Sequence, residues 1–136
     1  TLREIAKTEA IDLWLLFPLG QAVNRLLTRN SPPPESWAQC LTRLFGTDSW
    51  KEAFYRRTEG KDLFDRTNEN LVKDATYAAI GKFFVERLNS IFPGVASHPL
   101  ALYNSKGVPI YLLCFAAGNP KGAATAVKIA DHLLQR

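Results

Sequence analysis

Residues 11–20 read IDLWLLFPLG, and this stretch decides the predicted fold because it holds a single charged residue and stops at a proline and a glycine. It is too short to span a bilayer as a helix, which takes about twenty apolar residues. Its continuous apolar run instead predicts a β-strand over 11–17 that is buried on both faces. Such a strand needs neighbours, so we expect further structure before it, beginning with a short amphipathic helix in TLREIAKTEA.

The composition is that of one ordinary globular domain. The 136 residues are 46% hydrophobic and 22% charged, which excludes a generally disordered chain. With 17 basic and 13 acidic residues the net charge is +4, which favours anionic partners. The alternative is a slightly basic surface with no role in nucleic-acid binding. Because methionine is absent, we expect residues 1–136 to be a single fragment of a larger domain.

The two cysteines predict neither a disulfide framework nor a zinc motif. Cys40 and Cys114 lie far apart, and neither belongs to a CxxC pair. Cys114 stands within IYLLCFAAG, where a buried thiol is expected. No secretory or membrane-spanning segment is recognisable, so we expect a cytoplasmic protein that does not bind membranes.

The last third of the chain predicts two strands and a helix. ALYNSKGVPIYLLCFAAG indicates strands over 100–104 and 109–116 around a turn at 105–107. The helix that follows is expected to use Asn119 as its N-cap and Pro120 as its first residue. This capping explains GNPKG better than a phosphate-binding loop does.

The middle of the chain predicts mainly helix. NSPPPES is expected to be a stiff linker, because three prolines fix φ and remove donors. One helix should end at Gly46 and another should begin at Thr47. Residues 59–67 are expected to form a loop or a short helix, and a long helix is expected over residues 68–92. We therefore predict a helical insertion over residues 30–66.

Four stretches carry a resemblance to a known family: IDLWLLFPLG, VNRLLTR, LFGTDSWKEAFY and YLLCFAAGNPKGAATAVKIADHLL. Together they resemble the C-terminal half of the three-Cys-motif partner proteins, a bacterial and phage-associated family, over nearly the whole chain. Members of this family look like class I methyltransferase-type Rossmann proteins. They occur beside a separate protein that contains a three-cysteine motif, and their own activity is not settled by the resemblance.

The resemblance implies an α/β fold that is the C-terminal half of a methyltransferase-like Rossmann fold. Its three-stranded mixed sheet would have the order 11–17, 109–116, 100–104, with the middle strand antiparallel to both others. A missing N-terminal half would carry the glycine-rich loop and the acidic residue that hold S-adenosylmethionine. We therefore expect no cofactor in residues 1–136, although the full-length parent would bind S-adenosylmethionine. The implied partners are that N-terminal half and a three-Cys-motif protein.

The carboxyl end of strand 11–17 is the predicted edge of a substrate crevice, because open α/β sheets bind ligands beyond the carboxyl ends of their parallel strands. A planar base is expected to stack near Phe17, with Arg25 or Arg29 meeting phosphate. The alternative is that this turn only redirects the chain and that Arg25 is solvated. The crevice candidates, which continue into a helix predicted over 20–29, are Phe17, Pro18, Leu19, Gly20, Asn24 and Arg25.

A loose basic run interleaved with aromatic residues is the second candidate site. Such a pattern binds single-stranded nucleic acid by charge and stacking. The alternative places Trp50, Phe54 and Tyr55 in the core and the charges in solvent. His98 and His132 have no partners at ligand spacing, so no metal site is expected. The nucleic-acid contact candidates are Arg29, Arg43, Arg56, Arg57 and Lys61, with Arg66 beyond them.

These observations leave two functions open. In the first, the chain is the C-terminal portion of a three-Cys-motif partner protein that acts on nucleic acid as a methyltransferase, and the fragment alone is inactive. In the second, it is a non-catalytic partner or interaction subunit on a Rossmann-like frame. The fold does not decide between them. An intact upstream glycine-rich loop would favour the enzyme.

Overall fold

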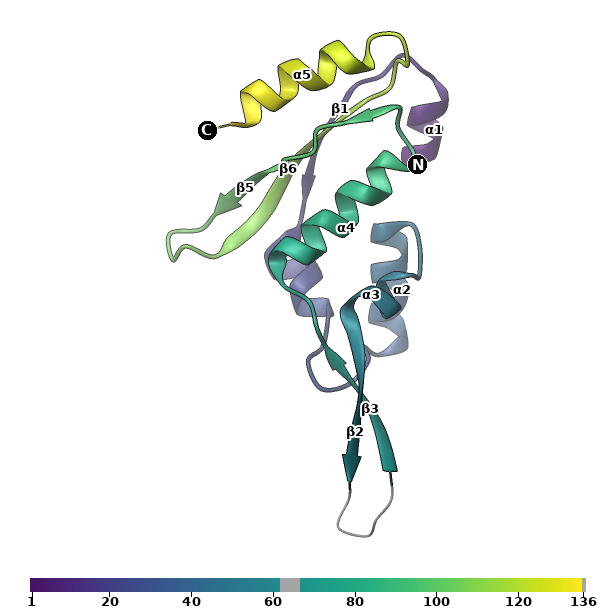
Figure 1. Ribbon diagram of the computed structural model, residues 1–136, viewed down its shortest axis with the longest axis vertical. Helices are drawn as coiled ribbons and strands as arrows, with labels where there is room; N and C mark the ends of the chain where they lie inside the picture. Colours follow the sequence, from purple (N-terminus) through teal and green to yellow (C-terminus); the bar gives the residue numbers. More distant parts are fainter. Residues whose placement is uncertain (62–66, 136) are drawn as a thin grey trace.

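The computed structural model describes residues 1–61 and 67–135, and its described strands form two sheets, the smaller of which projects as a hairpin in Figure 1. β6 (Pro109–Ala117) is the central strand of the larger sheet. Its Leu112 and Leu113 pair with two different strands, which therefore lie at opposite edges of β6. These neighbours are β1 (Leu13–Phe17) at one edge and β5 (Leu100–Tyr103) at the other, where β4 (Gly94–Val95) also pairs.

The predicted order 11–17, 109–116, 100–104 is confirmed, with two corrections. The sheet has four strands rather than three, because β4 also pairs with β6. Every described pairing in this sheet is antiparallel, so the described sheet is not mixed. The arrangement is an α/β fold in the coarse sense, and the Rossmann frame stays a prediction.

β1 does not have the burial that its apolar run predicts. Side chains alternate between the faces of a strand, and Phe17 is buried while Leu13 and Leu15 are partly covered. On the other face Trp14 is 45% exposed and Leu16 is 52% exposed. The strand is therefore covered on one face, and the prediction of burial on both faces is wrong for the described residues.

Helices cover the Phe17 face of the sheet. The ring of Phe17 stacks on that of Phe84 with centroids 3.9 Å apart, and it meets the ring of Phe45 at 5.7 Å. Both partners belong to one core that the sheet shares with these helices. The helices are α1 (Leu2–Lys7), α2 (Glu35–Phe45), α3 (Trp50–Phe54) and α4 (Tyr77–Asn89).

One helix, α5 (Ala123–Leu134), covers the opposite face. It packs Ala123, Ala130 and Leu134 against Phe115 and neighbouring small residues of the sheet. The helix begins later than predicted, because Gly122 is its N-cap. Asn119 instead caps a preceding turn, where its Oδ1 accepts a hydrogen bond from the Lys121 amide at 3.0 Å.

The ends of α2 and α4 follow from local chemistry. α2 ends at Gly46, whose φ of 70° is readily reached by glycine. Arg87 of α4 donates to the Phe45 and Gly46 carbonyl oxygens at 3.0 and 3.1 Å, which satisfies the end of α2. α4 begins where the Thr76 hydroxyl accepts from the Ala79 amide at 3.1 Å.

The predicted helical insertion is only partly helical. After α2 and α3 the chain forms an antiparallel hairpin of β2 (Tyr55–Lys61) and β3 (Thr67–Lys73), which projects from the rest of the molecule in Figure 1. The long helix predicted over 68–92 therefore begins only at Tyr77. Residues 62–66 lie outside the described part, so the prediction of a loop or short helix over 59–67 is corrected only at its ends.

A π-helical turn follows β1 directly. It spans Leu19–Asn24 and so overlaps the first half of the helix predicted over 20–29. The Val23 amide donates to the Pro18 carbonyl oxygen at 3.1 Å, an i→i+5 bond of the π type.

Among the described ranges, no helix has both the length and the apolar character that crossing a bilayer demands.

The two cysteines are expected to react with 5,5′-dithiobis(2-nitrobenzoate) at very different rates. Burial raises the pKa of the Cys114 thiol to about 12, whereas Cys40 is exposed on α2. Because the thiolate is the reactive form, Cys40 should be labelled in the native protein and Cys114 only after unfolding in urea. A Cys40→Ser control should remain unlabelled until it unfolds. Equal labelling rates for both thiols in native protein would contradict this burial.

Candidate functional site

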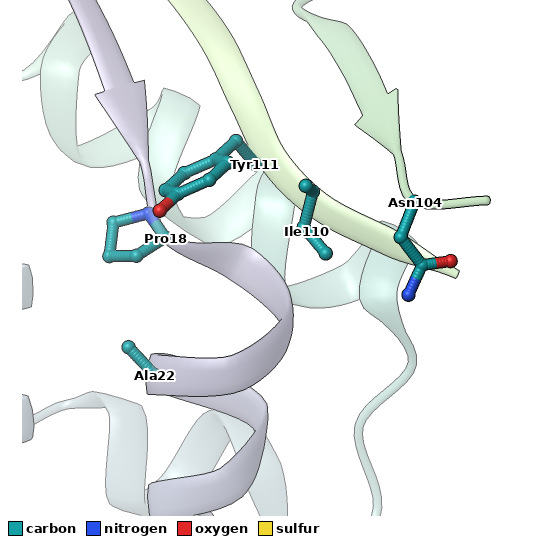
Figure 2. A pocket seen from close by; sticks show the side chains of 5 residues that line it. All are labelled: Pro18, Ala22, Asn104, Ile110 and Tyr111. Atoms are coloured by element: carbon teal, nitrogen blue, oxygen red, sulfur yellow. The ribbon is translucent and has the colours of Figure 1, made fainter. Parts of the chain in front are cut away.

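A first cavity, of about 340 Å³, lies where β1 ends. Figure 2 shows the Tyr111 ring beside Pro18, with Ala22, Ile110 and Asn104 completing the lining. The Asn104 side-chain oxygen already accepts from the Lys106 and Val108 amides, both at 2.9 Å. Asn104 therefore shapes the β5–β6 turn, and the lining contains no charged side chain.

Two of the six predicted crevice residues belong to the core rather than to this cavity. Phe17 and Leu19 are almost completely buried, so neither offers a ring or surface on which a base can stack. Of the four residues from Phe17 to Gly20, only Pro18 lines the cavity. Arg25 is exposed and does not line it.

Gly20 lies in the turn after β1, where two backbone segments come close together. In dinucleotide-binding folds a glycine-rich loop after a strand lets the backbone approach the ligand. A Cβ built on Gly20 would fall 2.4 Å from the Pro109 carbonyl oxygen. The turn after β1 therefore lies so close to the start of β6 that only glycine fits at position 20.

A second cavity, of about 550 Å³, lies at the base of the β2–β3 hairpin. It contains two cationic side chains, Arg29 and Lys73, and no carboxylate among the residues that line it. Two predicted candidates line this cavity, Asn24 from the substrate-crevice set and Arg29 from the nucleic-acid contact set. The lining residues are Asn24, Arg29, Asn30, Val72, Lys73, Ala75, Thr76 and Tyr77.

Hydrogen bonds hold the second cavity together across distant parts of the chain. The Lys73 ammonium donates to the Asn24 side-chain oxygen and, at 3.3 Å, to the Asn24 carbonyl oxygen. The Asn24 amide nitrogen in turn donates to the Tyr77 hydroxyl at 3.3 Å. The Lys73 backbone amide donates to the Arg29 carbonyl oxygen at 2.8 Å, which fixes the two cations on adjoining segments.

The electrostatics of this cavity favour an anion. Desolvation by burial, and then the nearby Arg29 charge, lower the pKa of Lys73 from its ordinary value. Both effects penalise the protonated amine, and an anion placed between the two cations would offset both. Phosphate oxygens bound by Arg and Lys are a common form of this arrangement.

The remaining basic candidates do not join this cavity. Arg43 lines a different cavity, of about 350 Å³, whose lining also includes Glu35 and Asp48. Arg56 and Arg57 are exposed on β2, close in sequence to the hairpin base. Lys61 ends β2, and Arg66 lies outside the described residues.

The aromatic residues between these charges are not a stacking surface. Trp50 and Phe54 are each 1% exposed and belong to the core. Tyr55 is partly buried and donates its hydroxyl to the Thr28 carbonyl oxygen at 2.8 Å. Burial raises the pKa of Tyr55, and the bond to Thr28 opposes that rise. Nucleic-acid binding at this site would therefore depend on charge more than on stacking.

In the described part of the chain, no group of three or more His, Cys, Asp and Glu side chains is placed to hold a metal ion. The Nδ1 atom of His98 lies 2.9 Å from the hydroxyl oxygen of its neighbour Ser97.

No protein-family model, curated protein or solved structure matches this chain. The resemblance to three-Cys-motif partner proteins therefore stays a prediction based on its motifs.

Proposed function

We propose that the chain is the C-terminal portion of a methyltransferase-like three-Cys-motif partner protein, and that it contributes a nucleic-acid phosphate site at the base of the β2–β3 hairpin. The observation that carries the phosphate site is that Arg29 and Lys73 both line one cavity, whose lining includes no carboxylate. The sequence motifs and the strand order support the wider assignment. The methyl acceptor and any catalytic group would belong to the parent protein.

Phosphate binding would rearrange one hydrogen bond and keep the scaffold. A phosphate oxygen would replace the Asn24 side chain as the acceptor for the Lys73 ammonium, and Arg29 would supply a second charged donor. Thr76 and Tyr77 line the same cavity and carry hydroxyl groups for the remaining oxygens. Phosphate contacts of this kind position a strand without reading its sequence, so binding should show little base preference.

The doubly substituted variant Arg29→Ala/Lys73→Ala should bind single-stranded RNA and DNA at least tenfold more weakly than the unsubstituted chain. Each lost phosphate contact should also reduce the slope of log K against log salt by about 0.7 for a single strand. Fluorescence anisotropy with labelled 12-nucleotide oligomers, measured at several salt concentrations, gives both quantities.

A matched control removes the same charge elsewhere. Lys106 and Lys128 are exposed and lie on the β5–β6 turn and on α5. Lys106→Ala/Lys128→Ala should leave the affinity within about twofold, because a general charge effect is weak beyond the Debye length. An equal loss in both double variants, or an unchanged salt slope, would contradict a phosphate site at Arg29 and Lys73.

A non-catalytic interaction subunit is the second candidate, favoured by the uncovered apolar side chains of Trp14 and Leu16. Exposed apolar side chains that gather on one face mark interaction surfaces in folded proteins. This candidate and the phosphate site are compatible, because Trp14 and Leu16 do not line the cavity at the hairpin base.

A further inference from the structure

Separate segments of the chain are already held together at the cavity at the hairpin base. The backbone of Arg29 is fixed, because its carbonyl oxygen accepts a hydrogen bond from the Lys73 amide. The preceding residue, Thr28, is held twice: its hydroxyl donates to the Ser31 carbonyl oxygen at 2.6 Å, and its carbonyl oxygen accepts from the Tyr55 hydroxyl. A site whose backbone is ordered in advance loses less conformational freedom when a ligand binds.

Two hydroxyl groups in the lining keep a hydrogen to donate. The Thr76 hydroxyl accepts from the Ala79 amide, and the Tyr77 hydroxyl accepts from the side-chain nitrogen of Asn24. A hydroxyl has one hydrogen and two lone pairs. Each oxygen is therefore an acceptor within the protein, while its hydrogen has no acceptor among the described residues. Both hydrogens are available to a ligand in the cavity.

The two cations of the lining keep donors as well. The Lys73 ammonium has three N–H groups, and both of its described hydrogen bonds go to Asn24. One N–H group remains, and displacement of the Asn24 side chain would give a second. No described residue accepts a hydrogen bond from the Arg29 guanidinium, whose forked N–H groups match the oxygens of a phosphate. Both cations can therefore donate to the same ligand.

The charge of the lining determines which anion it favours. Arg29 and Lys73 contribute two positive charges, and no carboxylate is part of the lining. Asp74 follows Lys73 in the chain but is exposed and does not line the cavity. Desolvation, and then the Arg29 charge, lower the pKa of Lys73. A ligand that carries two negative charges would oppose this shift more than a ligand that carries one.

The two kinds of phosphate in a nucleic-acid strand differ in how they match this lining. An internal phosphodiester carries one negative charge and has two unesterified oxygens, so it would leave one cation uncompensated. A terminal phosphate carries close to two negative charges at neutral pH and has three unesterified oxygens. The cavity volume of about 550 Å³ lies within the usual range for small-ligand sites. Val72 and Ala75 add an apolar part to the lining, against which a terminal sugar can pack.

We infer that the cavity at the hairpin base selects the phosphorylated end of a nucleic-acid strand over the phosphates within the strand. Arg29 and Lys73 bind the two negative charges, and the Thr76 and Tyr77 hydroxyls donate to the remaining oxygen. This inference rests on the proposed nucleic-acid phosphate site and narrows its ligand. A 5′ end and a 3′ end present the same group, so the experiment includes both.

Fluorescence anisotropy with the full chain tests this selection. The 12-nucleotide oligomers carry fluorescein at one end and a hydroxyl, a phosphate or a methyl phosphate at the other. At one of the two ends, the phosphate strand should bind about tenfold more tightly than the hydroxyl strand, because of the added hydrogen bonds between charged groups. The methyl phosphate has one charge and one unesterified oxygen fewer, so it should stay within about threefold of the hydroxyl strand. Equal affinities of hydroxyl and phosphate strands at both ends, or equal affinities of phosphate and methyl phosphate, would overturn the inference.

The double variants separate this inference from the proposed function. In Arg29→Ala/Lys73→Ala the preference for the phosphate strand should fall to within about twofold, whereas Lys106→Ala/Lys128→Ala should keep it. A preference retained in Arg29→Ala/Lys73→Ala would overturn the inference, because the phosphorylated end would then bind elsewhere. If hydroxyl and phosphate strands bind equally but this variant still lowers the salt slope, the phosphate site stands and only the selection of an end is wrong.

Competition distinguishes a strand end from a free nucleotide. Adenosine monophosphate should displace the phosphate strand at least tenfold less well than the unlabelled strand does, because the strand also releases counterions along its length. Equal displacement would show that the cavity binds a mononucleotide and would overturn the selection of a strand end. Circular dichroism of both double variants checks that the fold is intact, and the comparison of strand ends uses the unsubstituted chain.

Discussion

Replacement of Gly118 by alanine is expected to abolish stable folding. A Cβ built at this position would lie 2.1 Å from the Ile11 carbonyl oxygen, and this neighbour is backbone that cannot rotate away. The Gly118 amide also donates to the Asp12 carboxylate at 3.1 Å, which ties the start of β1 to the end of β6. The added methyl would push these two segments apart. Overpacking costs about 1–3 kcal/mol when side chains can adjust, and we expect a larger loss here.

Urea unfolding followed by circular dichroism measures this effect. Gly122→Ala is the matched control, because a Cβ at Gly122 meets nothing within 4 Å. Because Gly122 is an N-cap, its substitution by alanine should lower the free energy of unfolding by no more than about 1 kcal/mol. Similar unfolding midpoints for Gly118→Ala and the unsubstituted chain would show that the backbone separates there without strain.

Phe17→Ala should lower the free energy of unfolding by about 3–5 kcal/mol, the usual cost of removing a buried aromatic ring. Phe17 is 1% exposed, and its ring contacts those of Phe84 and Phe45. Its removal would leave a cavity where the sheet, α2 and α4 meet. This loss is a large fraction of the 5–15 kcal/mol that stabilises most domains.

The neighbouring residue supplies the control for this cavity. Leu16 belongs to the same strand but is 52% exposed, so Leu16→Ala should cost less than about 1 kcal/mol. Chemical unfolding of both variants at equal protein concentration gives the comparison. Equal losses would mean that Phe17 does not occupy the core position described above, and that the packing of α4 on β1 is wrong.

The strands that form the larger sheet could largely be predicted because their apolar runs are long and bounded by turn residues. β1, β5 and β6 lie where LWLLF, LALY and PIYLLCFAA indicate them. β4 could not be predicted, because two residues carry no periodicity. The burial of β1 was also mispredicted, since an apolar sequence shows what a strand can bury and not which neighbours cover it.

The β2–β3 hairpin shows why local patterns fail in polar segments. YRRTEGK and TNENLVK form β2 and β3, although few of their residues are apolar. The sequence predicts that most of TNENLVK belongs to the helix over 68–92, whereas that helix starts at Tyr77. Lys73 was missed for this reason, and because its partner Asn24 lies 49 residues away in the chain.

The candidate site was therefore only half predicted. Asn24 and Arg29 were named from their position after strand 11–17, and both line the cavity at the hairpin base. Phe17 and Leu19 were named for the same reason and lie in the core. Sequence position relative to a strand indicates which turn lies at its end, but it does not show that Phe17, the last residue of β1, and Leu19, the first residue of the π-helical turn, both point into the core.

The pairing of β1 with β6 has a consequence for synthesis of the nascent chain. Leu13 pairs with Ala116, about a hundred residues later. Translation at about 5–20 residues per second leaves the first of these strands without its partner for roughly 5–20 s. During that interval LWLLF is an unpaired apolar segment, and such segments aggregate unless something shields them. A chaperone that binds extended apolar peptides would therefore have a target at residues 13–17 before β6 leaves the ribosome.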